Sequence, residues 1–505
     1  MDAKGVITVQ LDHIIGTINP NIYGHFIEHL GRCIYPGIWV GEQSRASHVQ
    51  GLRRDVVDAL KRINLPVMRW PGGCFADAYH WIDGVGPPSQ RPHRQNIWWG
   101  GEDSNEFGTD EFMRFCSSVG AKAYLCVNVG SGSPQEALSW LEYCTYARNS
   151  SYSQLRAANG HPQPYNVTFW GVGNENWGCG GSFDPSSYAE VYKRFATYLR
   201  QANPSIQLIA CGHTTPNWNL RVMEALRGPR TMRLIDNLSI HYYFSGRRNP
   251  FGGDIKFTDE EYYNLLLDVQ NLEYHIQQAC HIVDSFSEQL KNIGLVIDEW
   301  GTWHPQATVD SGLYQQNTLR DAILAAVVLN LFNRYSRKIV MANLAQTVNV
   351  LQSLCLTKGD KTILTPTYHV FDLYQQHMGN DTLMVNVQSP TVKEASNTQS
   401  TRKLQPLHAL DATASLGDEG TRLVITLVNQ SLDDDLNTEI HLIHGSQEVE
   451  KVELSTLNAT DVRAHNDFDS PSTIIPRVEL GTINGKILHY TAPKHSVTRF
   501  TLTLK

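Results

Sequence analysis

The stretch NVTFWGVGNE, residues 166–175, carries the pattern that decides the fold. It is a short run of apolar, β-branched and aromatic residues that closes on glycine, asparagine and glutamate, as buried parallel strands do. Seven more runs share these features: NIYGHFIE (21–28), LPVMRWPGG (65–73), AKAYLCVNVG (121–130), SIQLIACG (205–212), DNLSIHYY (236–243), IGLVIDEWG (293–301) and KIVMANLAQ (338–346). The sequence therefore predicts a set of buried parallel strands.

Amphipathic segments separate these runs, for example LRRDVVDALKRIN (52–64), SYAEVYKRFATYLRQA (187–202) and LRDAILAAVVLNLFNR (319–334). Strands that alternate with helices in this way favour an α/β fold closed as a (β/α)8 TIM barrel. An open doubly wound sheet is the alternative. It would lead us to expect a glycine-rich phosphate loop after an early strand, and the sequence has neither G-x-G-x-x-G nor a Walker motif.

The rhythm changes after about residue 385. TRLVITLVNQS (421–431), NTEIHLIHG (437–445), QEVEKVELST (447–456) and KILHYTAPKHSVTRFTLTLK (486–505) alternate with period two between polar turns. This pattern is typical of an antiparallel β-sandwich, here jelly-roll-like. The opening GVITVQLD (5–12) is also strand-like and is expected to join it. We expect a catalytic barrel over 18–384 and a β-sandwich domain built from 1–17 and 385–505.

Composition excludes several classes of protein. The 505 residues are 41% hydrophobic and 18% charged, with a net charge of -8, which gives no case for nucleic acid or an anionic membrane surface. No apolar run reaches the ~20 residues that span a membrane, and the N-terminus shows no secretory signal. The nine cysteines are scattered, without a C-x-x-C pair. We expect a cytoplasmic protein with reduced cysteines.

One motif suggests a different chemistry. HFIEH (25–29) has the His-x-x-Glu-His spacing of inverted zinc peptidases, in which a helix presents both histidines to the metal. Glycines at 24 and 31 flank the segment, and its β-branched and aromatic residues favour a strand. On a strand, His25 and His29 would lie roughly 13 Å apart, too far to chelate one ion. We therefore expect both histidines to pack within the barrel.

Polar residues close the predicted strands, and in a β/α barrel the active site lies at the carboxyl ends of the strands. Glu28, Glu175 and Glu299 each end one run, and Arg69, Asn174, His241, Tyr243, Asn343 and Gln346 lie at or near other strand ends. A single strand-end acid is more often a salt bridge or a helix cap. Three at one mouth, with Trp98, Trp99, Trp177 and Trp303 in adjacent loops, favour cleavage of a glycosidic bond.

At these residues the chain resembles glycoside hydrolase family 51, the α-L-arabinofuranosidases, and most resembles bacterial intracellular members. The similarity rests on NPNIYGHFIEHLGRCIYPGIW (19–39), PVMRWPGGCFADAYHWIDGVGP (66–87), NEFGTDEFM (105–113), WGVGNENWGCGG (170–181), IDEWGTW (297–303) and MANLAQTVNVLQ (341–352). These motifs run across the whole predicted barrel. The C-terminal β region fits the family as well.

The resemblance implies a role for each matching residue. Glu175 would be the acid/base and Glu299 the nucleophile, while Glu28 would bind sugar hydroxyls. Further sugar contacts would come from Asn174, Tyr243 and Gln346, with His241 beside them. Cys74 stands where many members have asparagine, which puts that sugar contact in doubt. The loop with Cys179 differs from the shorter loop of other members, so the leaving-group preference does not transfer directly. A Cys74–Cys179 disulfide is left open, since it requires the two loops to meet.

We expect retaining hydrolysis through a covalent arabinosyl-enzyme, which needs carboxyl groups ~5–5.5 Å apart. Ionised Glu299 would attack the anomeric carbon and disfavour a second charge on Glu175. Arg69 is the candidate to keep Glu299 charged, with a purely structural ion pair as the equal alternative. Trp99 and Trp303 would line the leaving-group side, although core packing explains them equally well. No metal or organic cofactor is expected.

The expected substrates are arabinofuranosyl-containing oligo- and polysaccharides, from which an exo-acting enzyme removes terminal arabinose. Family resemblance also implies a homo-oligomer, in many members a hexamer. A family member acting as endoglucanase or β-xylosidase is the nearest alternative, and a non-catalytic carbohydrate-binding protein is the alternative from another class. The sequence leaves open the natural polymer, the linkage and the subunit count.

Overall fold

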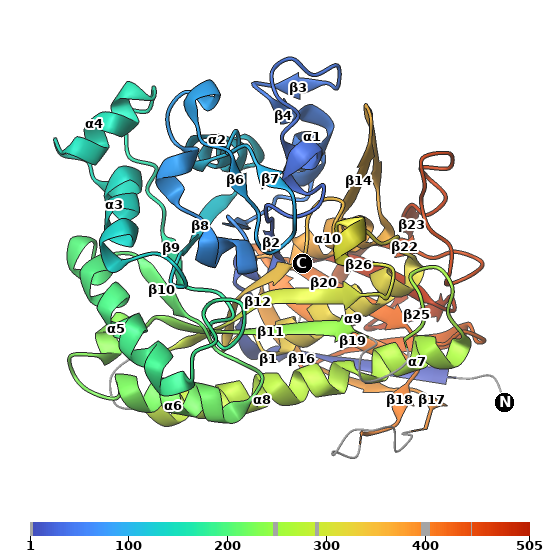
Figure 1. Cartoon of the computed structure of the whole chain (residues 1–505). Coiled ribbons are helices and arrows are strands. Elements are labelled where there is room, and N and C mark those ends of the chain that lie inside the picture. The colour runs from blue at the N-terminus through green and yellow to red at the C-terminus, as the bar shows by residue number, and fades with distance from the viewer. Residues whose placement is uncertain (1–3, 246–250, 288–291, 395–403, 446) are drawn as a thin grey trace.

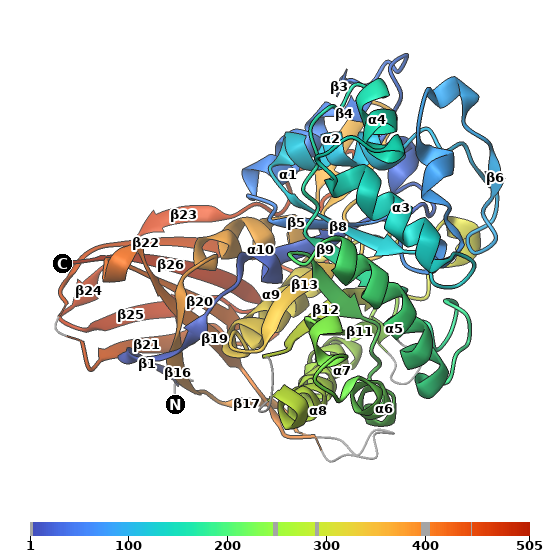
Figure 2. The same ribbon diagram turned by 90° about the vertical axis from the view of Figure 1, so that its left-hand side faces the viewer.

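The computed structural model describes residues 4–245, 251–287, 292–394, 404–445 and 447–505. A closed barrel and a large β-sheet lie side by side, with the barrel helices on one side of the molecule in Figure 2 and the sheet on the other. Within the described residues, no helix is both long enough and apolar enough to cross a membrane.

The barrel has the eight parallel strands that the sequence predicts, one in each apolar run, and so confirms the fold class. Its strands are β2 (Gly24–Phe26), β5 (Val67–Trp70), β8 (Lys122–Val127), β9 (Phe169–Val172), β10 (Gln207–Ala210), β11 (Asn237–Ser245), β12 (Gly294–Trp303) and β13 (Ile339–Leu344). A small apolar cluster of Val67, Tyr124, Ile209, Val296 and Met341 fills the barrel. Side chains alternate along a strand, so Arg69 follows Val67 on the inner face.

Ten α-helices are present in the described chain: α1 (Arg54–Arg62), α2 (Thr109–Val119), α3 (Pro134–Thr145), α4 (Ser151–Ala158), α5 (Pro185–Ala202), α6 (Pro216–Leu226), α7 (Asp259–Leu267), α8 (Val269–Ser287), α9 (Leu319–Arg334) and α10 (Pro366–Tyr374). Helix α9 is buried on all sides because it lies between the barrel and the sheet (Figure 1). Its Asn330 donates to Asp411 of the sheet and accepts from Tyr374 of α10.

The sheet has ten strands in the order β23-β22-β26-β20-β19-β16-β1-β21-β25-β24. These are β1 (Lys4–Thr17), β16 (Asp381–Gln388), β19 (Leu410–Gly417), β20 (Arg422–Asn429), β21 (Leu436–Ile443), β22 (Val449–Leu457), β23 (Arg477–Leu480), β24 (Ile483–Asn484), β25 (Ile487–Ala492) and β26 (Ser496–Leu504). All pairs are antiparallel except β1 with β21. The opening strand therefore joins this unit as expected. The exact domain boundaries stay a prediction.

The sheet curls over a single core. Strands β22 and β25 stand near opposite ends of the strand order, yet Thr456 and Tyr490 hydrogen-bond between them at 3.0 Å. One apolar cluster accordingly takes residues from strands along the whole order. Four short strand pairs complete the structure: β3 (His48–Val49) with β4 (Leu52–Arg53), β6 (Arg94–Gln95) with β7 (Glu102–Asp103), β14 (Cys355–Lys358) with β15 (Lys361–Leu364), and β17 (Thr391–Lys393) with β18 (Leu407–His408).

A buried histidine ties the two units together. His377, which follows α10, hydrogen-bonds through its ring nitrogens to Ser415 of β19 at 2.7 Å and Thr426 of β20 at 3.2 Å. Burial, with Arg499 and Arg422 nearby, lowers the pKa of His377 from 6.5 to about 3. The imidazole is therefore neutral in the folded protein at pH values where an unfolded chain would protonate it.

We expect His377 to contribute to acid instability. Its neutral form contributes stability that is fully present above pH 6.5 and is lost as the pH falls toward 3. The loss amounts to about 2 kcal/mol at pH 5. Thermal unfolding of His377→Asn should show a Tm that falls less steeply with pH than that of the unmodified protein. The exposed His93→Asn is the control, and an equal slope in all three proteins would contradict the assignment.

Candidate active site

A buried arginine stands at the centre of the barrel mouth. Arg69 of β5 has no exposed surface, and its Nη1 donates to Glu299 at 2.7 Å while its Nη2 donates to Asn174 at 2.5 Å. Its Nε lies 3.6 Å from Asp298, and the guanidinium packs over the Phe26 ring at 4.5 Å. One side chain thus joins the ends of β5, β9 and β12.

Glu299 lies in an environment that favours its ionised form. Besides the Arg69 contact, its Oε2 accepts a 2.7 Å hydrogen bond from the Tyr243 hydroxyl and lies 3.5 Å from Nδ1 of His241. Burial acts to raise the pKa of Glu299, but His241, Arg69 and Tyr243 outweigh it and hold the pKa below its usual range. The carboxylate is a charged group fixed by donors on both oxygens.

Glu175 faces Glu299 from the turn after β9. One carboxylate oxygen of each glutamate and a ring nitrogen of His241 all lie within 4.8 Å of one another. Nδ1 of His241 is 3.0 Å from Glu175, whose side chain is 22% exposed against 7% for Glu299. The backbone of Glu175 has φ 42°, a left-handed conformation that costs a non-glycine residue ~1–3 kcal/mol. The carbonyl of Glu175 accepts from Gly178 at 2.6 Å, which holds this turn.

Glu28 forms the third side of the site. Its Oε1 accepts from the Phe75 amide and the Trp99 indole, both at 3.0 Å, and its Oε2 accepts from Gln346 at 3.0 Å. Burial, followed by the charge of Glu299, raises the pKa of Glu28 to about 7. The glycine pair before Cys74 is required here, because a Cβ on Gly72 would lie 2.6 Å from Glu28 and a Cβ on Gly73 would lie 2.9 Å from Glu299.

The loops carrying Cys74 and Cys179 do meet. The two residues form a disulfide with a Cα–Cα distance of 5.5 Å, joining the turn after β5 to the turn after β9. A disulfide therefore stands where many relatives were expected to have an asparagine. The expectation of reduced cysteines is therefore wrong for this pair, while the other seven cysteines are free and buried.

The tryptophans do not all reach the site. Trp99 contacts Glu28, and Trp303 packs edge-on against Tyr243 with a ring distance of 5.4 Å. Trp177 instead donates to the Gly212 carbonyl at 3.2 Å and packs against His213. Trp98 lines a separate cavity. Asn343 lies below the mouth, where it donates to Asp298 at 2.9 Å.

The two histidines of HFIEH have separate structural surroundings. His25 packs against Phe371 with a ring distance of 4.5 Å. Nδ1 of His29 lies 2.5 Å from Asp103, and its Nε2 accepts from Trp70 at 3.0 Å. Neither joins a cluster of metal-binding geometry in the described part of the chain. The middle glutamate of the motif belongs to the barrel mouth.

Sequence reasoning missed Asp77. Its Oδ1 accepts from the amides of Val129 and Gly130 at 2.6 and 2.9 Å, and its Oδ2 accepts from the Asn174 amide at 2.8 Å and from Asn176 at 3.3 Å. Burial raises the pKa of Asp77 to about 7. These bonds fasten the turn that carries Glu175 from both sides. The only hint in the sequence is its place just after the PGGC segment.

Comparison with known proteins gives a consistent result. Two family models match, described as the α-L-arabinofuranosidase 1 domain over residues 59–261 and the α-L-arabinofuranosidase C-terminal domain over residues 298–496. A curated relative from Bacteroides ovatus, named as an intracellular exo-α-L-arabinofuranosidase, is 38% identical over 96% of this chain and 94% of its own length.

Solved structures agree over the whole chain. The structure of a GH51 arabinofuranosidase from Xanthomonas axonopodis pv. citri has a TM-score of 0.91 and 36% identity, covering 99% of this chain and 100% of its own. An arabinose complex of the Thermotoga maritima α-L-arabinofuranosidase has a TM-score of 0.88 and 35% identity over the same shares. The chain therefore belongs to the α-L-arabinofuranosidases of glycoside hydrolase family 51.

Proposed function

We propose that the protein is a retaining, exo-acting α-L-arabinofuranosidase. The observation that carries the proposal is the pair Glu175 and Glu299, since one carboxylate oxygen of each lies within 4.8 Å of the other. Retaining glycosidases hold their two carboxyl groups ~5–5.5 Å apart, whereas inverting enzymes leave a gap of ~6.5–9.5 Å for water. The short separation supports a double displacement.

Glu299 acts as the nucleophile. Arg69 and Tyr243 hold it charged and fix both oxygens, so that it meets the anomeric carbon without reorganising. Attack forms the ester bond of an arabinosyl-enzyme and breaks the glycosidic bond. Water then cleaves the ester, and the second inversion restores the original anomeric configuration.

Glu175 acts as the acid/base. It donates its proton to the departing oxygen in the first step and removes a proton from the incoming water in the second. His241, 3.0 Å from Glu175 and 3.5 Å from Glu299, orients both groups. Glu299 and Glu175 together outweigh burial and raise the pKa of His241.

Glu28, Asn174 and Gln346 grip the furanose hydroxyls. Each already lies in a hydrogen-bonded network at the barrel mouth, so the site is pre-organised for a polar ligand. The indole of Trp99 and the ring of Trp303 flank this network and offer faces to the sugar and the leaving group. Such contacts speed catalysis only if they tighten in the transition state.

The natural substrates are arabinofuranosyl saccharides derived from arabinoxylan or arabinan, hydrolysed in the cytoplasm by a homo-oligomer, a hexamer by family resemblance. The intracellular Bacteroides ovatus relative supports this location and the exo action. Endoglucanase, β-xylosidase and non-catalytic binding are not favoured, because full-length relatives carry the arabinofuranosidase name. Release of arabinose, but not of xylose or glucose, from a panel of aryl glycosides is the test.

Glu299→Ala should lower turnover of an aryl α-L-arabinofuranoside at least about 10³-fold, because it removes the nucleophile. Azide should then give the inverted glycosyl azide. Glu175→Ala should keep much more activity on a good leaving group, and azide should give the retained product. NMR of the products measures both outcomes. The matched control is Glu102→Ala, whose side chain is 76% exposed. Ordinary turnover by Glu299→Ala would disprove the assignment.

Tyr243→Phe should move the acid limb of the pH profile of kcat/KM upward. The hydroxyl lowers the pKa of Glu299, so its loss leaves the nucleophile protonated at a higher pH. The rate above the limb should fall about tenfold, since the lost hydrogen bond is to a charged group. Tyr242→Phe removes a neighbouring hydroxyl that donates to Asp268 and serves as the control. An acid limb that coincides in both variants would count against this role of Tyr243.

A further inference from the structure

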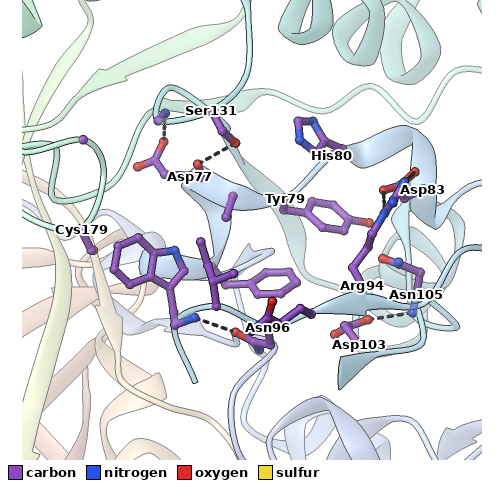
Figure 3. A pocket seen from close by; sticks show the side chains of 17 residues that line it. Asp77, Tyr79, His80, Asp83, Arg94, Asn96, Asp103, Asn105, Ser131 and Cys179 are labelled. Carbon is purple, nitrogen blue, oxygen red and sulfur yellow. Dashed lines mark hydrogen bonds and ion pairs between the residues drawn. The ribbon is translucent and has the colours of Figure 1, made fainter. Parts of the chain in front are cut away.

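A cavity of about 390 Å³, drawn in Figure 3, lies beside the barrel mouth, and its lining includes none of the three glutamates. The turns after β5, β8 and β9 and the hairpin of β6 and β7 line it. Cys179 lies at one side of Figure 3, and the Arg94–Asp83 ion pair lies at the other. A second cavity of about 400 Å³ shares His80, Asp83 and Arg94 with the first. The two cavities are therefore neighbours, and we call the first one the groove.

A single turn connects this groove to the candidate active site. Oδ1 of Asn96 accepts from the amides of Trp98 at 3.3 Å and Trp99 at 3.0 Å, while its Nδ2 donates to the His29 carbonyl at 2.8 Å. In this turn the indole of Trp99 donates to Glu28, while Trp98 lines the groove. The surfaces that Trp98 and Trp99 offer to ligands thus belong to consecutive residues of one turn.

The Cys74–Cys179 disulfide lies between the groove and the candidate active site. Cys179 lines the groove, and its partner Cys74 follows the glycine that approaches Glu28 and Glu299. Phe75 also lines the groove, and its backbone amide donates a hydrogen bond to Glu28 at 3.0 Å. The groove therefore lies next to the site, on the other side of a shared wall.

The chemistry of the groove suits a neutral sugar chain. Trp98 is 36% exposed and Ile97 63% exposed, which offers apolar surface for the faces of sugar rings. The exposed Gln95 supplies a neutral donor and acceptor for hydroxyl groups, while Asn105 and Ser131 lie in the wall with side chains already hydrogen-bonded within the protein. Arg94 is paired with Asp83 at 2.8 Å, so the groove has no unbalanced cation to select phosphate.

One buried polar atom in the wall lacks a partner. Tyr79 lines the cavity and is 5% exposed, and its hydroxyl has no hydrogen-bond partner among the described residues. That oxygen lies beside Gly84, next to Asp83. An unpaired buried hydroxyl costs free energy, so this oxygen adds an unsatisfied polar atom to the wall of the cavity.

We propose that this groove binds a further part of the pentose-based saccharide chain that carries the arabinose to be removed. The proposal rests on the proposed function for the identity of the chain. Trp98 supplies the stacking surface, and Arg94 with Gln95 contacts hydroxyl groups. The groove sets the preference for long substrates and leaves the chemistry in the barrel unchanged.

The test compares substrates of different length in Trp98→Ala and Arg94→Gln. Both variants should raise the KM for arabinose-bearing xylo-oligosaccharides about fivefold or more, while kcat/KM for 4-nitrophenyl α-L-arabinofuranoside stays within about twofold. Tyr198→Ala, which removes an aromatic ring that is 55% exposed on α5, should leave both substrates unaffected. Equal losses on both substrates, or no loss on either, would overturn the proposal.

Direct binding separates failure of the groove from failure of the proposed function. Calorimetry with xylohexaose on the unmodified protein, and with arabinohexaose on Glu299→Ala, requires no turnover. Binding that is lost in Trp98→Ala supports the groove, and the tighter ligand identifies a xylan or an arabinan chain. Absence of binding by both ligands would overturn the proposal even if the enzyme hydrolyses the aryl substrate.

Discussion

The structure of the site depends on the burial of one guanidinium. Burying a charged side chain costs free energy unless opposite charges and hydrogen bonds compensate for the lost hydration. Removing one partner of a buried ion pair is destabilising because it leaves the other charge buried and uncompensated. Arg69 meets this condition through Glu299, Asn174 and Asp298, which come from two other strands of the barrel. The same contacts that make burial of Arg69 tolerable also fix the group proposed as the nucleophile.

Two consecutive acids reach Arg69 only because β12 is irregular. Successive side chains of a regular strand point to opposite faces. In β12 the pairing with β11 passes from Ile240–Ile297 to His241–Glu299, so Asp298 is an extra residue, as in a β-bulge. Asp298 then accepts from Tyr124 at 2.7 Å, below the mouth, while Glu299 faces the site. The bulge gives one strand both a structural acid and the acid proposed as the nucleophile.

The parts of the structure that could be predicted are those with a local sequence signal. Parallel strands buried on both faces appear as continuous apolar runs, and all eight runs proved to be barrel strands. Their polar ends identified Glu28, Glu175 and Glu299, because strand ends in a barrel converge. The Cys74–Cys179 pair remained undecided, and Asp77 was missed, because both depend on how irregular loops meet. The strand order of the curled sheet could not be predicted either, because it also depends on packing between segments far apart in the sequence.

The three glutamates differ by environment rather than by residue type. Three carboxylates at one mouth cannot all be ionised cheaply, since each charge disfavours the next. Arg69 donates to Glu299 and so favours the ionised form of that carboxyl group. Glu28 has three neutral donors but no direct ion pair among the described residues, and its pKa is raised to about 7. A sugar that displaces water would strengthen these interactions. Burial and the charge of Glu299 therefore set Glu28 apart from the carboxylate that Arg69 contacts.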